Sequence, residues 1–165
     1  MPWPDSPGFA RHAGCRNRSS SPSGVGRGTH AVRIEKQGDA LVPVEVWSNA
    51  DVAPQFATPV LAGGLLFGLS DRGNLYCLNA QTGATAWVDP GQTDRGSFAA
   101  IVNLGEAIVA LPTSGELIAF STQADAYSEL ARLKVADTAT YAQPVIAGTR
   151  VFVKDEGAVT LWTLD

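Results

Sequence analysis

Side chains that could act as nucleophiles, bases or metal ligands are few in this sequence, and they are scattered. The two histidines, His12 and His30, stand in or beside the N-terminal segment, so the body of the chain cannot assemble a Ser-His-Asp triad or a histidine metal site. The two cysteines, Cys15 and Cys77, lie in dissimilar surroundings, which indicates neither a disulfide framework nor metal-ligand spacing. Cys77, inside "LYCLN", is typical of a small buried hydrophobic residue. The sequence therefore predicts no catalytic constellation.

Carboxylates offer another route to chemistry, as general bases or as calcium ligands. Asp71, Asp94, Asp155 and Glu156 stand in turn-like stretches, where solvated acids are the ordinary case, and no calcium-binding loop surrounds them. The glycine-rich "GGLLFG" leads into neither a helix nor a lysine, so it is a poor phosphate cradle and indicates a hairpin turn. We therefore expect no cofactor and no metal in this chain.

The composition is that of a single globular domain. Of 165 residues, 45% are hydrophobic and 17% are charged, which is enough for one core. The formal charge is −4, and four arginines fall before Gly28, so the body is distinctly acidic and a nucleic-acid partner is not expected. No apolar run is long enough to span a bilayer, and the first residues lack the apolar region of a signal peptide. We expect a soluble chain, cytoplasmic as written, with no direct membrane insertion.

The first 29 residues differ from the rest. They are rich in proline, serine, glycine and arginine, as in "SSSPSGVGRG", and such a segment cannot offset its ordering entropy by burial. We interpret residues 1–29 as a disordered or foreign N-terminal arm that precedes the folded region, residues 30–165.

The folded region contains an internal repeat. Three stretches align, "GGLLFGLSDRGNLYCL", "GEAIVALPTSGELIAF" and "GTRVFVKDEGAVTLW", the last after one deletion in a turn. Their glycines Gly73, Gly115 and Gly157 fall into register 42 residues apart (115 minus 73, and 157 minus 115). A short apolar stretch precedes each copy: "PVLAG", "IVNLG" and "PVIAG". Three matches in register indicate a repeat architecture.

Each repeat is predicted to consist of strands alone. Glycines punctuate short apolar runs where tight hairpin turns need a positive φ. A unit of about forty residues with four strands has the size of one β-propeller blade, whereas a β-sandwich needs no long-period register. The stretch "DAYSELARLKV", from Asp125, is spaced like a helix face, but the repeat register predicts a strand there.

The stretch "LYCLNAQTGATAW" resembles the blade motif of pyrroloquinoline-quinone-type (PQQ-like) propellers, in which a Thr-Gly turn is followed by a tryptophan four residues beyond the glycine. Gly83 and Trp87 stand in those places, and Trp47 takes the tryptophan place of an earlier blade. The resemblance implies that the indole spreads over the neighbouring blade while its N–H reaches a backbone carbonyl. The next repeat lacks both Thr-Gly and tryptophan, so Tyr127 or Leu130 is expected to dock there. The residues assigned to turns and blade docking are Trp47, Gly73, Gly83, Trp87, Gly115 and Gly157.

The resemblance implies an all-β fold, a partial β-propeller. Residues 30–47 match a partial blade, 58–88 and 98–135 match two blades, and 141–165 match a second partial blade. This is an open arc of about three to four four-stranded antiparallel blades from a seven- or eight-bladed ring. We interpret the chain as the C-terminal part of a longer, periplasmic or secreted protein. Its open blade edges are expected to self-associate.

Blade topology also predicts where a ligand would bind. The loops that lead into first strands and the hairpins between second and third strands share one face of a propeller. Mixed charges beside an aromatic side chain suit a protein, a peptide or a small polar ligand, although an ordinary solvated loop face has the same composition. The residues expected on this face are Gln55, Asp71, Arg72, Asp94, Arg95, Tyr141, Lys154 and Asp155.

Propellers of this resemblance include quinone-cofactor dehydrogenases, scaffold propellers such as the periplasmic lipoprotein of outer-membrane assembly, and secreted repeat proteins. The enzymes use a carboxylate base beside bound calcium and quinone, often with adjacent cysteines, and no Cys-Cys pair occurs here. The leading hypothesis is a non-catalytic module for protein interaction or scaffolding. The alternative is a C-terminal fragment of a quinoprotein oxidoreductase whose active site lies in missing blades.

Overall fold

The computed structural model describes residues 28–90 and 95–163, and all of the regular elements assigned in them are β-strands. The arm predicted for residues 1–29 lies outside the described residues except at its end, where the first strand already begins at Thr29. Among the described residues, no helix is long and apolar enough to cross a membrane.

The described strands form four antiparallel sheets, each paired in chain order. Sheet 1 contains β1 (Thr29–Gln37) and β2 (Ala40–Asn49). Sheet 2 contains β3 (Val60–Ala62), β4 (Leu65–Leu69), β5 (Leu75–Asn79) and β6 (Thr85–Val88). Sheet 3 contains β7 (Ala99–Asn103), β8 (Ala107–Pro112), β9 (Glu116–Ser121) and β10 (Glu129–Lys134). Sheet 4 contains β11 (Val145–Ala147), β12 (Arg150–Lys154) and β13 (Val159–Thr163).

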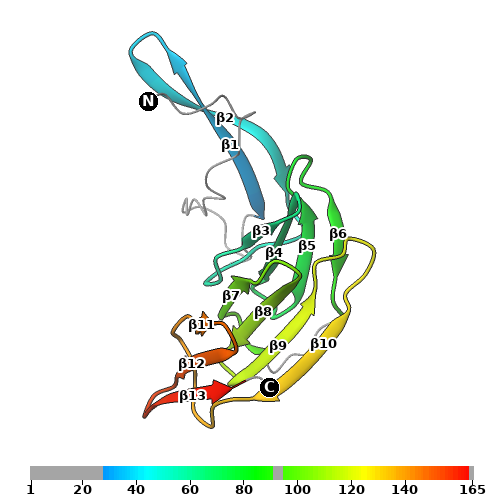
Figure 1. Ribbon diagram of the computed structural model, residues 1–165. Coiled ribbons are helices and arrows are strands. Elements are labelled where there is room, and N and C mark those ends of the chain that lie inside the picture. Colours follow the sequence, from blue (N-terminus) through cyan, green and yellow to red (C-terminus); the bar gives the residue numbers. More distant parts are fainter. Residues whose placement is uncertain (1–27, 91–94, 164–165) are drawn as a thin grey trace, which may run out of the picture.

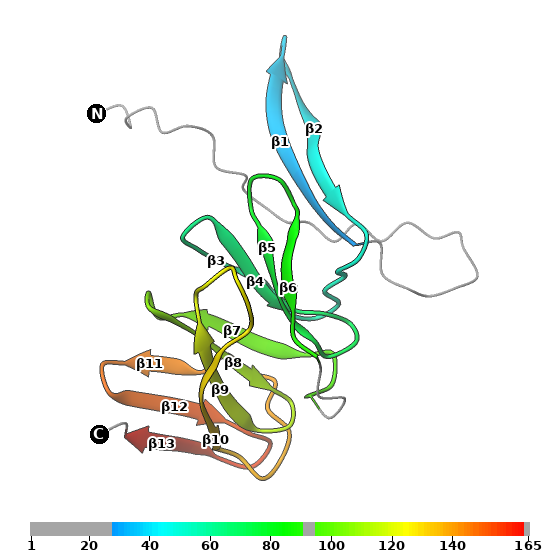
Figure 2. The same cartoon turned by 90° about the vertical axis from the view of Figure 1, so that its right-hand side faces the viewer.

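The four sheets follow one another along an open arc. Figure 1 shows the β1–β2 hairpin projecting from one end and sheet 4 lying at the other, and Figure 2 shows sheets 2, 3 and 4 stacked beside one another. We call the face of a sheet that is turned toward the next sheet in the chain its front face. The face turned toward the preceding sheet is its rear face.

Stacking explains why the central strands read as unbroken apolar runs. Side chains alternate between the two faces of a strand, so a strand covered on both faces needs apolar residues at every position. In β5, the front-facing Leu75 and Cys77 and the rear-facing Tyr76 and Leu78 are all fully buried. Gly68 lies opposite Tyr76, and a Cβ there would come within 2.4 Å of the Tyr76 Oη, so the glycine makes room for the ring.

One apolar cluster fills each space between neighbouring sheets. Trp47 and Leu66 pack against Val52, Tyr76 and Leu78 between sheets 1 and 2. The largest cluster, between sheets 2 and 3, holds Phe67, Trp87, Ile108, Ile118 and Phe120 among others. A third cluster, between sheets 3 and 4, holds Val109, Leu111, Leu117, Val135, Val151 and Val153, with Ala100, Ala119, Ile146 and Trp162 packed against it. The core is therefore three inter-sheet layers.

Two tryptophans cross these layers in the same way. The Trp47 Nε1 donates to the Ala80 carbonyl at 3.0 Å, and the Trp87 Nε1 donates to the Gln123 carbonyl at 2.9 Å. Both acceptors lie just after the third strand of the following sheet. The Trp87 ring also contacts the rings of Phe120 and Tyr127, at centroid distances of 6.1 and 5.5 Å.

The third layer lacks such a tryptophan, and the expectation for it was wrong. Ala131 pairs with Ala119 in the register in which Trp87 pairs with Cys77, so Ala131 stands in the tryptophan place. Tyr127 turns back onto Trp87 in the preceding layer, and Leu130 is exposed at a bulge of β10. The bulge moves the register, which sequence alignment alone did not reveal. The strand predicted for this stretch, despite its helix-like spacing, is confirmed as β10.

Glycine is required at two of the assigned turns. At Gly83, with φ +73°, a Cβ would lie 2.4 Å from the Trp47 Cε3, so the indole sits directly on the glycine backbone. At Gly115, with φ +74°, a Cβ would lie 2.3 Å from the Ala136 carbonyl oxygen. Gly73 also has a positive φ, of 80°, whereas a Cβ at Gly157 would have its nearest contact at 4.0 Å.

Candidate functional site

Loops that lead into first strands meet the hairpins between second and third strands on one side of the arc. The Asp71 N–H donates to the Ala53 carbonyl at 2.8 Å, which joins the two kinds of loop in sheet 2. In sheet 4 the Glu156 N–H donates to the Thr138 hydroxyl at 3.2 Å, and the Thr140 hydroxyl donates to the Pro112 carbonyl at 2.6 Å. These bonds fix the loop backbones that carry the candidate side chains.

A shallow hollow of about 250 Å³ lies at the sheet 4 end of these loops. Its wall includes the ring of Tyr141, which is 64% exposed and is supported from behind by Phe98 at a centroid distance of 5.6 Å and an interplanar angle of 55°. An exposed ring held in place by a second ring can contact a partner without losing much rotamer freedom. The lining residues are Ala139, Tyr141, Ala142, Lys154, Asp155 and Glu156.

The three charges at the hollow are not equivalent. The Asp155 Oδ1 accepts from the backbone N–H groups of Ala158 at 2.7 Å and of Gly157 at 2.9 Å, and these bonds, that of Ala158 foremost, lower the pKa of the carboxyl. Asp155 is thus committed to forming its own turn. The Lys154 Nζ donates to the Asp155 carbonyl, and Glu156 is exposed. This turn role of Asp155 was not predicted, although an aspartate two residues before a glycine often indicates such a turn.

The other expected face residues are distributed differently. Gln55 and Arg72 are exposed and Asp71 is half-buried at the sheet 2 end, and none of the three lines the hollow at Tyr141. Asp94 lies outside the described residues. The structure therefore brings Tyr141, Lys154 and Asp155 together at the hollow, whereas Gln55, Asp71 and Arg72 lie in loops of sheet 2 and do not line it.

Arg95 was expected on the loop face, and this expectation is wrong, since the residue lies in the interior. Its Nη1 is paired with the Asp89 carboxylate, and both side chains are buried. The Asp89 Oδ1 also accepts from the Leu75 N–H at 2.9 Å. A buried carboxylate needs a countercharge and hydrogen-bond donors, and Arg95 supplies the countercharge. The sequence contains one indication that Asp89 is buried, since it stands two residues after Trp87. Asn49 stands two residues after Trp47 and is likewise buried and hydrogen-bonded.

In the residues that the structure describes, the carboxylate and cysteine side chains do not fit a site for calcium and a quinone. Within those residues, no group of three or more His, Cys, Asp or Glu side chains is placed to hold a metal ion. Asp155 is engaged by its turn and Asp89 by Arg95. Burial raises the pKa of the Cys77 thiol to about 11, so this cysteine is not poised as a nucleophile.

Comparisons with known proteins identify the fold. BamB from Moraxella catarrhalis is similar over 84% of this chain and 43% of its own, with a TM-score of 0.61 and 14% identity. A chain of the Mitotic Checkpoint Complex is similar over 84% of this chain and 46% of its own, with a TM-score of 0.59 and 13% identity. The quinohemoprotein alcohol dehydrogenase ADHIIG from Pseudomonas putida HK5 is similar over 66% of this chain and 19% of its own, with a TM-score of 0.53 and 17% identity. No protein-family model matches the sequence, and no curated protein matches it.

The chain thus has a β-propeller fold, present as an open arc of antiparallel sheets. The fold class predicted from the sequence is confirmed. The chain spans less than half the length of each of these three structures.

Proposed function

We propose that this chain is a non-catalytic propeller module for protein interaction or scaffolding, and that it is a fragment of a longer protein. The observation that carries the proposal is the exposed ring of Tyr141, supported by Phe98, at the edge of a hollow that also presents Lys154 and Glu156. Protein interfaces are enriched in rigid aromatic anchors ringed by polar groups. The mixed charges favour a protein or peptide partner over a nucleic acid.

The comparisons support a propeller module, and one of the similar structures is, by its title, a chain of the Mitotic Checkpoint Complex. Blades that pack face to face leave their loops free to vary, which suits a surface that binds partners. We further propose that the full-length protein is periplasmic or secreted, on the strength of the PQQ-like resemblance. A signal peptide encoded upstream of this region tests that proposal.

Site-specific photo-crosslinking tests the interaction face. A photoreactive phenylalanine analogue at position 141 is expected to give a defined protein adduct in the native cells, and the Lys154→Glu change is expected to weaken it. The matched control is the same analogue at Leu130, which is 58% exposed against 64% for Tyr141 but lies on the outer strand β10. Equal adducts at both positions, or none at 141, would contradict the proposal.

One observation favours a second candidate function, a quinoprotein oxidoreductase whose active site lies outside this chain. That observation is the likeness to the quinohemoprotein alcohol dehydrogenase. Since the described residues do not fit a calcium and quinone site, we expect no dye-linked alcohol or sugar oxidation when pyrroloquinoline quinone and calcium are added to the purified chain. Reproducible turnover that is lost on chelation would place an active site within this chain and would contradict both candidate functions.

A further inference from the structure

Three loops that lead into first strands each carry an aromatic residue at the same place in the repeat. These residues are Phe56, Phe98 and Tyr141. Each stands four residues before an equivalent position of the first strand that follows it. The equivalent positions, defined by their pairing with the second strands, are Val60, Val102 and Val145. The aromatic position therefore belongs to the repeat, and the three loops can be compared directly.

Among these three positions, only Tyr141 is both exposed and supported by a second ring. Phe56 is 60% exposed, but no ring contact to it occurs among the described residues. Phe98 is half-buried and lies against Tyr141. The hollow beside the Tyr141 ring, with the lining residues given above, is named the Tyr141 hollow. It distinguishes sheet 4 from a solvated loop that merely exposes an aromatic side chain.

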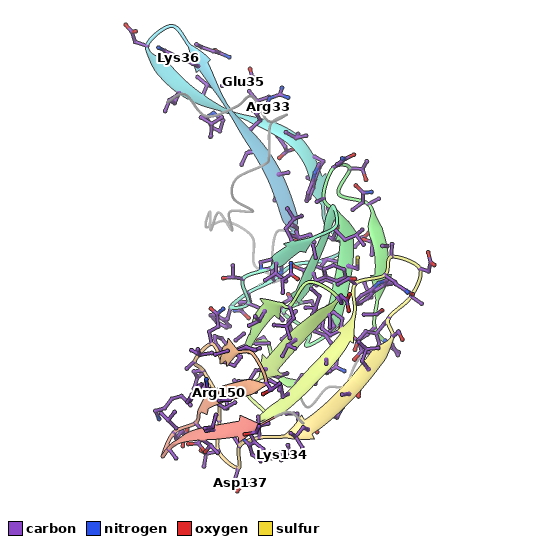
Figure 3. All side chains as sticks on the ribbon, in the orientation of Figure 1. Arg33, Glu35, Lys36, Lys134, Asp137 and Arg150 are labelled. Atoms are coloured by element: carbon purple, nitrogen blue, oxygen red, sulfur yellow. The ribbon has the colours of Figure 1, made fainter. Side chains whose placement is uncertain are left out.

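The loop that carries Tyr141 is tied to the sheet before it. The Lys134 Nζ donates to the Ser114 carbonyl in the β8–β9 hairpin at 2.7 Å, and the buried Thr140 hydroxyl donates to the carbonyl at the end of β8 at 2.6 Å. Figure 3 shows Lys134 and Asp137, where this loop starts, at the sheet 4 end of the arc. Because the loop is already fixed, binding there would cost little ordering entropy.

The wall of the Tyr141 hollow offers few polar groups to a ligand. Two alanine methyl groups and the Tyr141 ring supply apolar surface, and Asp155 is used by its own turn. The Lys154 Nζ spends one donor on the Asp155 carbonyl and keeps two. Among the described residues, the Tyr141 hydroxyl, these two donors and the Glu156 carboxylate remain. A saccharide would leave many hydroxyls unpaired here, so the wall favours a ligand that needs few hydrogen bonds.

The size and construction of the hollow narrow the choice further. About 250 Å³ is less than the roughly 300–1,000 Å³ of pockets that enclose small ligands, which favours an anchor residue of a larger partner. An added strand would need an exposed sheet edge, and an amphipathic helix would need a long groove. The hollow is formed instead by one loop and the β12–β13 hairpin.

We propose that the Tyr141 hollow binds a proline-rich segment of a partner protein in the polyproline II conformation. Such segments dock on aromatic side chains, make no internal hydrogen bonds and lose little entropy on binding. A proline ring lies on the Tyr141 ring, and the segment's backbone carbonyls accept from the Tyr141 hydroxyl and the Lys154 ammonium. The Glu156 carboxylate complements an arginine or lysine beside the prolines. This inference rests on the proposed function and names the chemistry of its partner.

Selection of random twelve-residue peptides displayed on phage tests the proposal on the full chain. We expect peptides that contain spaced prolines and a basic residue, and that bind the unmodified chain and Phe56→Ala but not Tyr141→Ala. Phe56→Ala is the matched control, since it removes an equally exposed ring at the same place in the repeat. Peptides that depend on Tyr141 but lack proline would overturn this inference and leave the proposed function standing.

Other outcomes of the selection are equally decisive. Selection of no peptide that depends on Tyr141 would also overturn the inference, and so would binding to an oligosaccharide array that Tyr141→Ala abolishes. Photo-crosslinking at position 141 reports a protein partner of any chemistry, so it judges the proposed function separately.

Titration of one selected peptide, labelled for fluorescence anisotropy, measures each contact. Tyr141→Ala should weaken binding at least about tenfold, as for an interface anchor, and Phe56→Ala should leave it unchanged. Glu156→Gln should weaken it about two- to fivefold at low salt and less at high salt, because the charge is exposed. Replacing the prolines of the peptide by alanine leaves the protein untouched and should weaken binding at least as much as Tyr141→Ala. Unchanged affinity after that replacement would contradict the proposal even if a protein variant fails to fold.

Discussion

Single tryptophans connect neighbouring sheets in this molecule. Trp47 and Trp87 each lie in the outer strand of one sheet and donate to a carbonyl of the next, and each buries a large flat surface in an apolar cluster. A tryptophan is suited to this role because one side chain combines a large apolar area with a single N–H donor. The stability of the first two sheet pairs, sheets 1 and 2 and sheets 2 and 3, should therefore depend strongly on one residue each.

Replacing Trp87 tests this dependence. Trp87→Ala is expected to lower the free energy of unfolding by about 3–5 kcal/mol, because it removes a buried aromatic side chain and leaves a cavity beside Phe67 and Phe120. Val88→Ala, at the exposed neighbouring position, should cost about 0.5 kcal/mol or less. Urea denaturation measures both values. An unchanged unfolding midpoint for Trp87→Ala would contradict the docking role.

Gly83 provides a second residue-level prediction with a matched control. Gly83→Ala and Gly64→Ala both place a Cβ at a positive φ, of +73° and +80°, which costs about 1–2 kcal/mol. Only at Gly83 does the new Cβ meet the Trp47 ring, at 2.4 Å, while Gly64 has nothing within 4 Å. We expect Gly83→Ala to be more destabilising by about 1–3 kcal/mol, the range for overpacking. Equal melting temperatures for the two variants would show that the indole does not rest on the glycine.

At the scale of elements, the outer strand β10 is attached differently from β6. It lacks a tryptophan at the docking position, and its side chains form a polar network in which Arg132 donates to Glu129 at 2.8 Å and to Glu116 at 2.9 Å. The bonds from Arg132 are the main cause that lowers the pKa of Glu129 below its usual value of 4.5. These ion pairs therefore attach β10 to β9 within sheet 3 and do not reach the next sheet.

This network predicts a pH dependence for β10. Because the folded-state pKa of Glu129 is lowered, its contribution to stability is present above about pH 4.5 and is lost as the pH falls through the lowered value. Arg132→Met is expected to cost up to about 1 kcal/mol at pH 7, since the pair is partly exposed, and the cost should shrink as the solution is acidified below the usual value.

Denaturation at a series of pH values measures the difference between the two proteins. Arg33→Met is the control, because its partner Glu35 forms a more exposed pair on the hairpin, and the cost there should be close to zero at every pH. A cost for Arg132→Met that does not change with acidification would mean that the carboxylate pairing does not stabilise β10.

At the scale of the whole molecule, the repeat period was the feature of the sequence that predicted the fold. Glycines 42 residues apart and the short apolar runs between them were sufficient to predict the strands of sheets 2, 3 and 4, because a blade needs turns and buried faces at fixed spacing. Two features were not predicted. The bulge in β10 moved Tyr127 and Leu130 out of the expected register, and Arg95 entered the core as a countercharge to Asp89. The bulge and the burial of Arg95 both depend on contacts between particular residues, and the repeat spacing does not indicate such contacts.

On the loop face, too, one part of the arrangement could be predicted from the sequence and another part could not. Topology predicted that Tyr141, Lys154 and Asp155 would share one side of the arc, because the loops that carry them lie at the same end of their strands. Which of these side chains a partner could contact was set by hydrogen bonds that the sequence does not specify. Asp155 is used by its turn, whereas Tyr141 is left open beside Phe98.

Amide hydrogen exchange along the chain tests most directly the claim that the molecule is an open arc of sheets docked face to face. At dilutions where the chain is monomeric, we predict the slowest exchange in β4, β5, β8 and β9, which have neighbours on both edges and sheets on both faces. Exchange should be fastest at the β1–β2 hairpin tip and in β13, which lie at the two ends of the arc (Figure 2). Uniform protection across all four sheets, or protection that is greatest in β1 and β2, would contradict this arrangement of the sheets.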